Sequence, residues 1–440
     1  MSNPTVHVVN LGCRVNRVES DRMTVELDRR GFDLVDEDDA EIVVINTCAV
    51  TGEAEAKTRK AVRHALGCAR DPWVIVTGCA VNLHADVLTA LSERVIAEPS
   101  KAKVAACAER LVADRLRDRP HSDDCDATTL TDLLGRSRIG VKVQDGCDNR
   151  CSYCIVWKAR GPERSVALDR VLDDVRAAAA SGIAEVVLTG VNLGAYRASD
   201  GSGKVLGIDG LLESIVRDTD IPHIRLSSIE PMDIDEALLA RMAAHPTRVA
   251  PFLHVPIQSG CTETLARMNR PYDADDLLDL VDMIRGAVPG IALSGDLIVG
   301  FPGETDEEFE CTRALVERIG FSRLHVFRYS ARPGTPAATM PDQVPAQTMA
   351  ARSAVIRALV DKTSRADAAA RIGTIERAVI EYPGRGTLGS FHRVIVDDAS
   401  DDLVGRLVDV AIMDVDSHGV LRGRVVRSAG AGAEAPVDLR

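Results

Sequence analysis

The chain has 440 residues, of which 45% are hydrophobic, and a formal net charge of −13, so it can bury a large core spread over about two to four domains. The negative charge argues against a protein that coats nucleic acid non-specifically, although a local basic surface stays possible. No run of roughly 18 uncharged apolar residues occurs, and the start, Met1–Thr5, lacks the pattern of a secretory signal. We therefore expect a cytoplasmic protein with no membrane partner.

Three short β-branched runs predict the first strands, and each is followed by a cysteine and then a helical pattern. The runs are Val6–Val9, Ile42–Ile45 and Val74–Val76, and the cysteines are Cys13, Cys48 and Cys79. Near-continuous apolar runs separated by helical stretches are typical of buried parallel strands in an α/β sheet. Open parallel sheets bind ligands beyond the carboxyl ends of their strands. The three thiols are therefore expected to converge on one site.

A charged, helix-prone stretch at Lys101–Arg119 and a polar linker at residues 121–136 end a first domain predicted at residues 1–120. Six strands are predicted beyond it: Gly140–Val143, Glu185–Leu188, His223–Leu226, Phe252–Val255, Ile291–Val299 and Arg323–Tyr329. Helices are predicted between or after them at Asp169–Ala180, Asp209–Asp218, Asp235–Ala244, Asp275–Gly286 and Thr305–Gly320. Six units are too few for an eight-unit barrel but fit an open, partial (β/α)6 barrel over residues 137–366, with its functional face at the carboxyl ends of the strands.

From about Ile372 the pattern changes to short strands that predict a small all-β barrel over residues 370–428, followed by an Ala/Gly-rich tail at residues 429–440 that we expect to be disordered. The strands are predicted at Arg377–Glu381, His392–Val396, Leu407–Val410 and Val420–Val426, with a turn at Gly384–Gly386. The predicted fold class is thus α/β: a parallel α/β domain, a partial barrel and a small C-terminal β-barrel.

Cys147, Cys151 and Cys154 stand at positions i, i+4 and i+7 directly after the first predicted barrel strand. In a reducing compartment, the eleven cysteines of the chain are better explained by metal binding, reactivity or burial than by disulfides. Closed zinc sites normally have four ligands, and no fourth is present locally. Three cysteines suit a four-iron cluster that keeps one iron open. This spacing resembles that of radical S-adenosylmethionine (SAM) enzymes, and an incomplete zinc site is the alternative.

The spacing of Cys13, Cys48 and Cys79 is less specific, because they are far apart in the sequence. They could simply be buried cysteines that pack as small apolar residues. Their common position after strands favours a second metal site. The remaining cysteines lack that placement: Cys68, Cys107, Cys125, Cys261 and Cys311.

Eight segments resemble the methylthiotransferases of the radical SAM superfamily, and the resemblance runs from Val6 to about Val426. They are Leu11–Asn16, Ile45–Cys48, Val76–Cys79, Gln144–Cys154, Leu188–Gly194, Ser227–Pro231, His254–Gly260 and Asp296–Glu304. The resemblance implies a methylthiotransferase domain, a radical SAM barrel and a C-terminal TRAM domain that binds RNA. It also implies two [4Fe-4S] clusters, one on each cysteine trio, and SAM as cofactor.

Three segments are most similar to the branch that modifies C2 of N6-threonylcarbamoyladenosine at position 37 of tRNA: Leu11–Asn16, Asn46–Thr51 and Val326–Thr335. That activity implies two SAM molecules per product, sulfur carried at the Cys13/Cys48/Cys79 cluster, a reductant protein or equivalent electron donor, and a sulfur source. The alternatives are a methylthiotransferase acting on isopentenyladenosine-37 of tRNA or on a ribosomal protein. An RNA-binding iron–sulfur protein without turnover is an alternative of another class.

Further site residues follow from the resemblance and from local charge. SAM contacts are expected at Tyr153, Thr189, Gly190, Glu230, Gln258 and Gly300. The alternative for these positions is ordinary βα turns and core packing. RNA contacts are expected at Arg150, Lys158, Arg160 and Arg393, although such charges are commonly a solvated face. After the third cluster cysteine the family usually has a Pro, whereas this chain has Ile155–Lys158.

Overall fold

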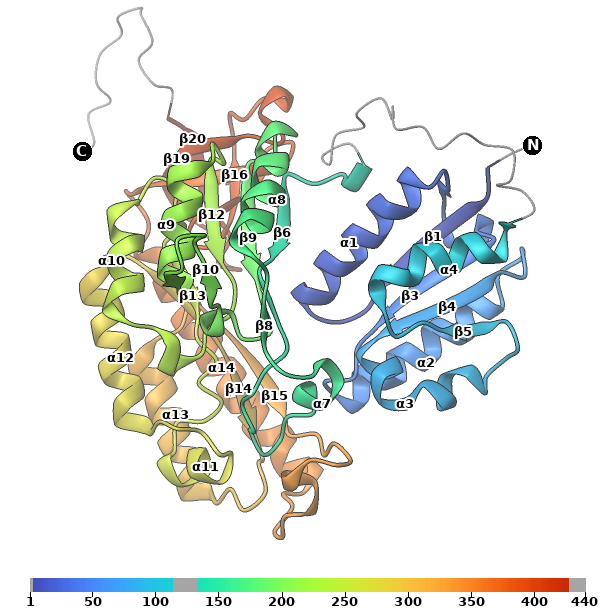
Figure 1. The fold of residues 1–440 in the computed structure, drawn as a ribbon. Coiled ribbons are helices and arrows are strands. Elements are labelled where there is room, and N and C mark those ends of the chain that lie inside the picture. The colour runs from blue at the N-terminus through green and yellow to red at the C-terminus, as the bar shows by residue number, and fades with distance from the viewer. Residues whose placement is uncertain (1–2, 114–132, 427–440) are drawn as a thin grey trace, which may run out of the picture.

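The computed structural model describes residues 3–113 and 133–426 (Figure 1). Most of the predicted linker at residues 121–136, and the whole predicted tail at residues 429–440, lie outside the described residues. Within the described ranges, no helix combines the length and apolar character that crossing a membrane requires.

The N-terminal part is a parallel α/β layer structure, as predicted. Its five strands pair in the order β2-β1-β3-β4-β5. They are β1 (Thr5–Asn10), β2 (Asp33–Leu34), β3 (Ile42–Thr47), β4 (Trp73–Gly78) and β5 (Val95–Ala97), with helices α1 (Arg14–Arg29), α2 (Gly52–Leu66), α3 (Cys79–Thr89) and α4 (Val104–Leu111). Alternate residues of β3 enter different cores: Val43 and Ile45 pack with Val62 of α2, whereas Val44 packs with Leu27 of α1. Both faces of the sheet are covered, which explains the continuous apolar runs.

The central part contains six parallel strands in two three-stranded sheets, ordered β12-β9-β6 and β13-β14-β15. They are β6 (Arg138–Lys142), β9 (Glu185–Thr189), β12 (His223–Leu226), β13 (Phe252–His254), β14 (Ala292–Val299) and β15 (Arg323–Arg328). A bridge between Ser228 and His254 connects the two sheets. The predicted partial barrel is thereby confirmed.

Helices cover the outside of this partial barrel (Figure 1). They are α8 (Leu168–Ala180), α9 (Ile208–Asp218), α10 (Glu236–Ala244), α11 (Thr262–Arg267), α12 (Ala274–Ala287), α13 (Asp306–Ile319) and α14 (Ala346–Ala369). Short elements complete it: β7 (Gln144–Asp145), α7 (Val156–Arg160), β8 (Arg164–Ser165), β10 (Ala198–Ser199) and β11 (Val205–Leu206). Val186 and Leu188 of β9 belong to the core under the helices. Thr189 therefore points to the opposite, inner face of its strand.

The C-terminal part is a closed five-stranded barrel, ordered β16-β17-β18-β20-β19. Its strands are β16 (Ile375–Tyr382), β17 (Arg385–Leu388), β18 (Arg393–Val396), β19 (Leu407–Val415) and β20 (Leu421–Val425). The turn predicted at Gly384–Gly386 is shorter, because only Gly384 has a positive φ (+66°) and β17 begins at the next residue. Gly386 lies within the ladder, where a Cβ atom would stand 2.7 Å from the carbonyl oxygen of Val379.

The two ends of the central strands contact different parts of the chain. At the amino ends, Arg138 of β6 forms an ion pair with Glu381 of the C-terminal barrel, with N and O atoms 2.8 Å apart. At the carboxyl ends, α7 lies against α3 (Figure 1), where Asn82 Nδ2 donates to Ala159 O at 2.7 Å. The functional face predicted for the barrel therefore lies toward the cysteine-bearing loops of the N-terminal sheet.

Candidate active site

The loop that carries Cys147, Cys151 and Cys154 is fixed by Gln144, a buried residue of β7. Its Nε2 donates to Gly146 O at 2.9 Å, and its Oε1 accepts from the N–H groups of Val191 and Asn192 at 3.0 and 2.9 Å. Gly146 has a φ of +74°, and a Cβ atom there would lie 1.9 Å from a backbone carbonyl oxygen. Only glycine fits such a position. The loop is thus held against the segment that follows β9.

A buried arginine contacts the middle cysteine of this loop. Arg270 Nη1 donates to Cys151 Sγ at 3.0 Å, and its Nε donates to Tyr272 Oη at 2.8 Å. The same guanidinium forms an ion pair with Glu230. Burial raises the pKa of the Glu230 carboxyl, and Arg270 opposes this shift. Arg270 therefore places a positive charge directly beside Cys151.

The two outer cysteines of the loop are held in surroundings that disfavour a free thiolate. Burial raises the pKa of Cys147 to about 11 and that of Cys154 to about 12. Cys154 Sγ accepts a hydrogen bond from the Val156 N–H at 3.4 Å. At neutral pH these free thiols stay protonated, so metal binding there must release protons.

Cys13, Cys48 and Cys79 lie together at the carboxyl ends of the N-terminal strands. Cys13 precedes α1 and is exposed, whereas Cys48 and Cys79 are 5% exposed. A Cβ atom at Gly12, which has a φ of +105°, would lie 2.8 Å from Cys48 Sγ, so glycine permits the close approach of the two loops. Burial raises the pKa of Cys48, and the neighbouring Cys13 and Cys79 raise it further. The Cys13 thiol also lies 3.8 Å from Asn16 Oδ1.

Arg160, at the end of α7, links the two cysteine-bearing regions. Its side chain is 4% exposed; Nη1 donates to Glu19 and Asp145, both at 2.9 Å, and Nη2 donates to Asn16 Oδ1 at 2.6 Å. Burial alone would lower the pKa of Arg160, but the nearby Cys79 and Glu19 outweigh burial and raise it. Because Asn16 and Glu19 belong to α1 and Asp145 to the barrel loop, one side chain joins both domains.

Replacing Arg160 with Met should destabilise the protein by about 3 kcal/mol, because loss of one partner leaves buried charges without their counter-ion. Arg160→Lys should lose less stability, since lysine keeps the positive charge but not the planar guanidinium that bonds several partners at once. The free energy of unfolding from urea titration measures both. Arg70→Met is the matched control, because Arg70 is exposed; a loss at Arg160 no larger than the loss at Arg70 would contradict the expected role.

The donor sets fit iron–sulfur clusters better than single ions. Among the described residues the cysteines are free thiols. Two groups of side chains there have ligand atoms within 4.8 Å of one another, and neither contains a predicted cluster ligand: Glu37, His64 and Cys68, and His254, Asp296 and His325. Cysteines of a four-iron cluster each reach a separate iron, so their sulfur atoms lie farther apart than ligands that share one ion.

The predicted SAM residues on the first barrel strands are placed close to the cysteine loop. Thr189 ends β9, but its hydroxyl donates to Val187 O of its own strand at 3.0 Å. Gly190 packs against Gln144, whose Oε1 would lie 3.1 Å from a Cβ atom there. Glu230 is held by Arg270, as described above. A SAM contact at these positions stays a prediction.

The remaining predicted SAM residues have visible structural roles. Gln258 is buried and has a φ of +65°, a strained conformation for a residue other than glycine. The Gly300 N–H donates to Glu304 Oε1 at 3.0 Å. Tyr153 packs against a small apolar cluster that includes Phe301 and Tyr329. The strain at Gln258 is the feature among these that most favours a functional role.

The predicted RNA residues fall into two groups. Arg150 and Lys158 are exposed and approach the ring of Trp157, at 4.6 and 5.0 Å from its centroid. The ring of Trp157 thus has two cationic partners. Arg393 of β18 is also exposed. Arg160 is also predicted to contact RNA, but its side chain is buried. It donates hydrogen bonds to Glu19, Asp145 and Asn16.

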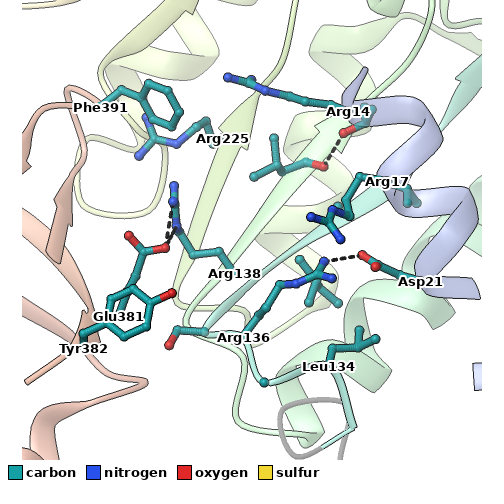
Figure 2. A pocket seen from close by; sticks show the side chains of 17 residues that line it. Arg14, Arg17, Asp21, Leu134, Arg136, Arg138, Arg225, Glu381, Tyr382 and Phe391 are labelled. Carbon is teal, nitrogen blue, oxygen red and sulfur yellow. Dashed lines mark hydrogen bonds and ion pairs between the residues drawn. The ribbon is translucent and has the colours of Figure 1, made fainter. Parts of the chain in front are cut away.

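A cavity that the sequence analysis missed lies between α1, the inner face of β6, β9 and β12, and the C-terminal barrel (Figure 2). We call it the arginine chamber; its volume is about 450 Å³. Five arginines and two acids are among the residues that line it: Arg14, Arg17, Arg136, Arg138, Arg225, Asp21 and Glu381. Arg138 begins β6, and Arg225 lies within the four-residue strand β12; charged residues in buried strands are a signal that could have indicated a polar interior.

The sequence comparisons give consistent matches over most of the chain. The radical SAM superfamily model matches residues 141–316, and the model described as uncharacterized protein family UPF0004 matches residues 5–97. The tRNA-2-methylthio-N(6)-dimethylallyladenosine synthase of Novosphingobium aromaticivorans is 35% identical, over 95% of this chain and 97% of its own length. The threonylcarbamoyladenosine tRNA methylthiotransferase MtaB of Thermotoga maritima is 32% identical, over 96% and 97%.

A structural comparison supports the fold. The radical S-adenosylmethionine methyltransferase TsrM from Kitasatospora setae, solved with cobalamin and a [4Fe-4S] cluster, has a TM-score of 0.55 and 17% identity, with 77% of each chain covered. At this identity the likeness concerns the fold alone.

Proposed function

Because the chain belongs to the tRNA methylthiotransferase family of radical SAM enzymes, we propose that it attaches a methylthio group to C2 of N6-threonylcarbamoyladenosine at position 37 of tRNA. The observation that carries the proposal is the pair of cysteine trios at the carboxyl ends of two parallel sheets, linked through Arg160. One trio serves radical formation and the other serves sulfur transfer.

Cys147, Cys151 and Cys154 would hold a [4Fe-4S] cluster, which with SAM supplies a radical able to remove hydrogen from an unreactive carbon. The chain contributes position and charge. Gln144 fixes the cysteine loop, and Arg270 donates to Cys151. Such positioning matters because radical chemistry needs the reacting carbon held close and water excluded.

Cys13, Cys48 and Cys79 would hold a second [4Fe-4S] cluster, where the sulfur for transfer is carried. A target adenine has to reach the space between the two sites. A looped-out base, which exposes its edge and its π-face, is the usual way in which such enzymes reach a nucleotide. An electron donor protein and a source of sulfur would have to serve the enzyme in the cytoplasm.

The choice of the threonylcarbamoyl substrate rests on the amino-acid sequences of three segments: Leu11–Asn16, Asn46–Thr51 and Val326–Thr335. Relatives named for dimethylallyladenosine and for threonylcarbamoyladenosine match the chain at 35% and 32% identity. The dimethylallyladenosine synthase name of the first relative makes isopentenyladenosine-37 the second candidate substrate.

Mass spectrometry of tRNA nucleosides from a deletion strain tests the substrate. We expect loss of the 2-methylthio form of N6-threonylcarbamoyladenosine, with its unmethylthiolated precursor retained, because the precursor is made upstream. Complementation with the wild-type gene should restore the product, and complementation with a Cys151→Ala gene should not. Loss of the isopentenyl species would instead support the second candidate, and an unchanged tRNA profile would contradict both.

A further inference from the structure

We infer that the arginine chamber binds the carboxylate of the threonyl group on the target base, and that Arg14 makes the contact. This inference rests on the proposed substrate and extends it by naming the residue that would recognise its acidic substituent.

The charge balance leaves Arg14 without a counter-ion. Most other arginines of the chamber have one: Arg136 pairs with Asp21 at 2.6 Å, Arg138 with Glu381 at 2.8 Å and Arg225 with Glu185 at 2.9 Å. Within residues 3–113 and 133–426, Arg14 and Arg17 have no ion pair and no side-chain hydrogen bond. The acids that line the chamber are therefore already used, and a site for an external anion is left.

An aromatic ring is part of the lining of the chamber. Phe391, from the C-terminal barrel, is surrounded by four guanidinium groups, whose carbons lie 4.9 to 5.7 Å from the ring centroid. They belong to Arg14, Arg138, Arg225 and Arg323. A ring attracts cations but does not neutralise them. Several guanidinium groups around one ring suit a small anionic group such as a carboxylate.

The position of Arg14 connects the chamber with the chemistry. Arg14 follows Cys13 directly and is the first residue of α1, and Figure 2 shows its side chain extending toward Arg225 and Phe391. A guanidinium can donate two parallel hydrogen bonds to a carboxylate. An apolar isopentenyl group in the same place would remove water from Arg14 without supplying an acceptor, which is costly. The chamber should therefore favour an acidic substituent.

Equilibrium binding of anticodon stem-loop RNA to the reconstituted holoenzyme, followed by fluorescence anisotropy, tests the inference. Three RNAs differ at position 37: threonylcarbamoyladenosine, isopentenyladenosine and adenosine. Arg14→Gln should weaken binding of the threonylcarbamoyl RNA by about 10-fold to 100-fold and leave the adenosine RNA within about twofold. Arg14→Lys should keep part of the preference. Arg70→Gln, at the opposite end of β4 from Cys79, is the matched surface control and should change none of the three.

The outcomes separate this inference from the proposed function. If wild-type enzyme methylthiolates the threonylcarbamoyl RNA but Arg14→Gln weakens all three RNAs equally, Arg14 binds a backbone phosphate and the inference fails alone. Unchanged binding by Arg14→Gln also overturns the inference alone. If wild-type enzyme acts on the isopentenyl RNA and not on the threonylcarbamoyl RNA, the proposed substrate fails and the inference fails with it.

Discussion

Replacing Cys151 with Ala should abolish both SAM cleavage and methylthiolation. Cys151 is the middle member of the trio expected to bind the radical-forming cluster, it is 7% exposed, and it accepts a hydrogen bond from Arg270. Its loss removes a ligand and also leaves a buried guanidinium without one of its acceptors. Release of 5′-deoxyadenosine from reduced, reconstituted protein given SAM measures the effect, and we expect it to fall to the uncatalysed background.

Iron content provides a second measurement on the same variant. Two four-iron clusters give about eight irons per chain, so the variant should hold about four. Cys107→Ala is a matched control, because Cys107 is also buried but lies in an apolar core far from the barrel loop. The control should keep its iron and its activity. If the Cys151 variant released as much 5′-deoxyadenosine as the wild-type protein, Cys151 would not have the assigned role. If the wild-type protein released none, an RNA-binding protein without turnover would be favoured.

Replacing Cys13 with Ala should separate the two chemical functions. The variant should still cleave SAM, because the Cys147/Cys151/Cys154 loop is untouched, but it should form no methylthiolated product. Cys13 is exposed and makes no side-chain capping bond to α1, so the substitution should cost little stability. Product from methylthiolation assays with tRNA, 5′-deoxyadenosine and iron content should be measured together.

The two variants make a matched pair. Each should lose about four irons, yet only the Cys151 variant should lose SAM cleavage. If the Cys13 variant still makes product, the sulfur is carried elsewhere and the two-cluster proposal is wrong. If the Cys13 variant loses SAM cleavage as well, SAM cleavage at one cysteine trio depends on the other trio. The hydrogen bonds of Arg160 alone would not explain such a dependence.

The fold was predictable where a strand is buried and has at least four residues. His223–Leu226 is predicted and observed with the same ends, since Pro222 precedes it and Ser227 follows it. β2 and β5 were not predicted, because two or three residues give no periodicity. β17 was missed because Gly386 suggested a turn, although it is the close approach of Val379 that requires glycine there.

The site was predictable where the chemistry is local in the sequence. Cys147, Cys151 and Cys154 lie within eight residues, so their spacing alone indicates a shared ligand. Arg160 is different: its partner Glu19 is 141 positions away, and no local pattern distinguishes a buried ion pair from a solvated charge. The arginine chamber was missed for the same reason, since Arg14 and Phe391 meet only in the folded chain.

The attachment of the C-terminal barrel has a consequence for how a position in RNA is chosen. Arg225, fully buried in β12, donates to the carbonyl oxygens of Leu388 and Gly389 at 3.0 and 2.7 Å. The barrel is thus bonded to the strands whose other ends face the cysteine loops. For a stem-loop bound by that barrel, the modified nucleotide would be the one whose distance from the bound segment matches the distance between the barrel and the cysteine loops. The identity of the bases between them would not matter.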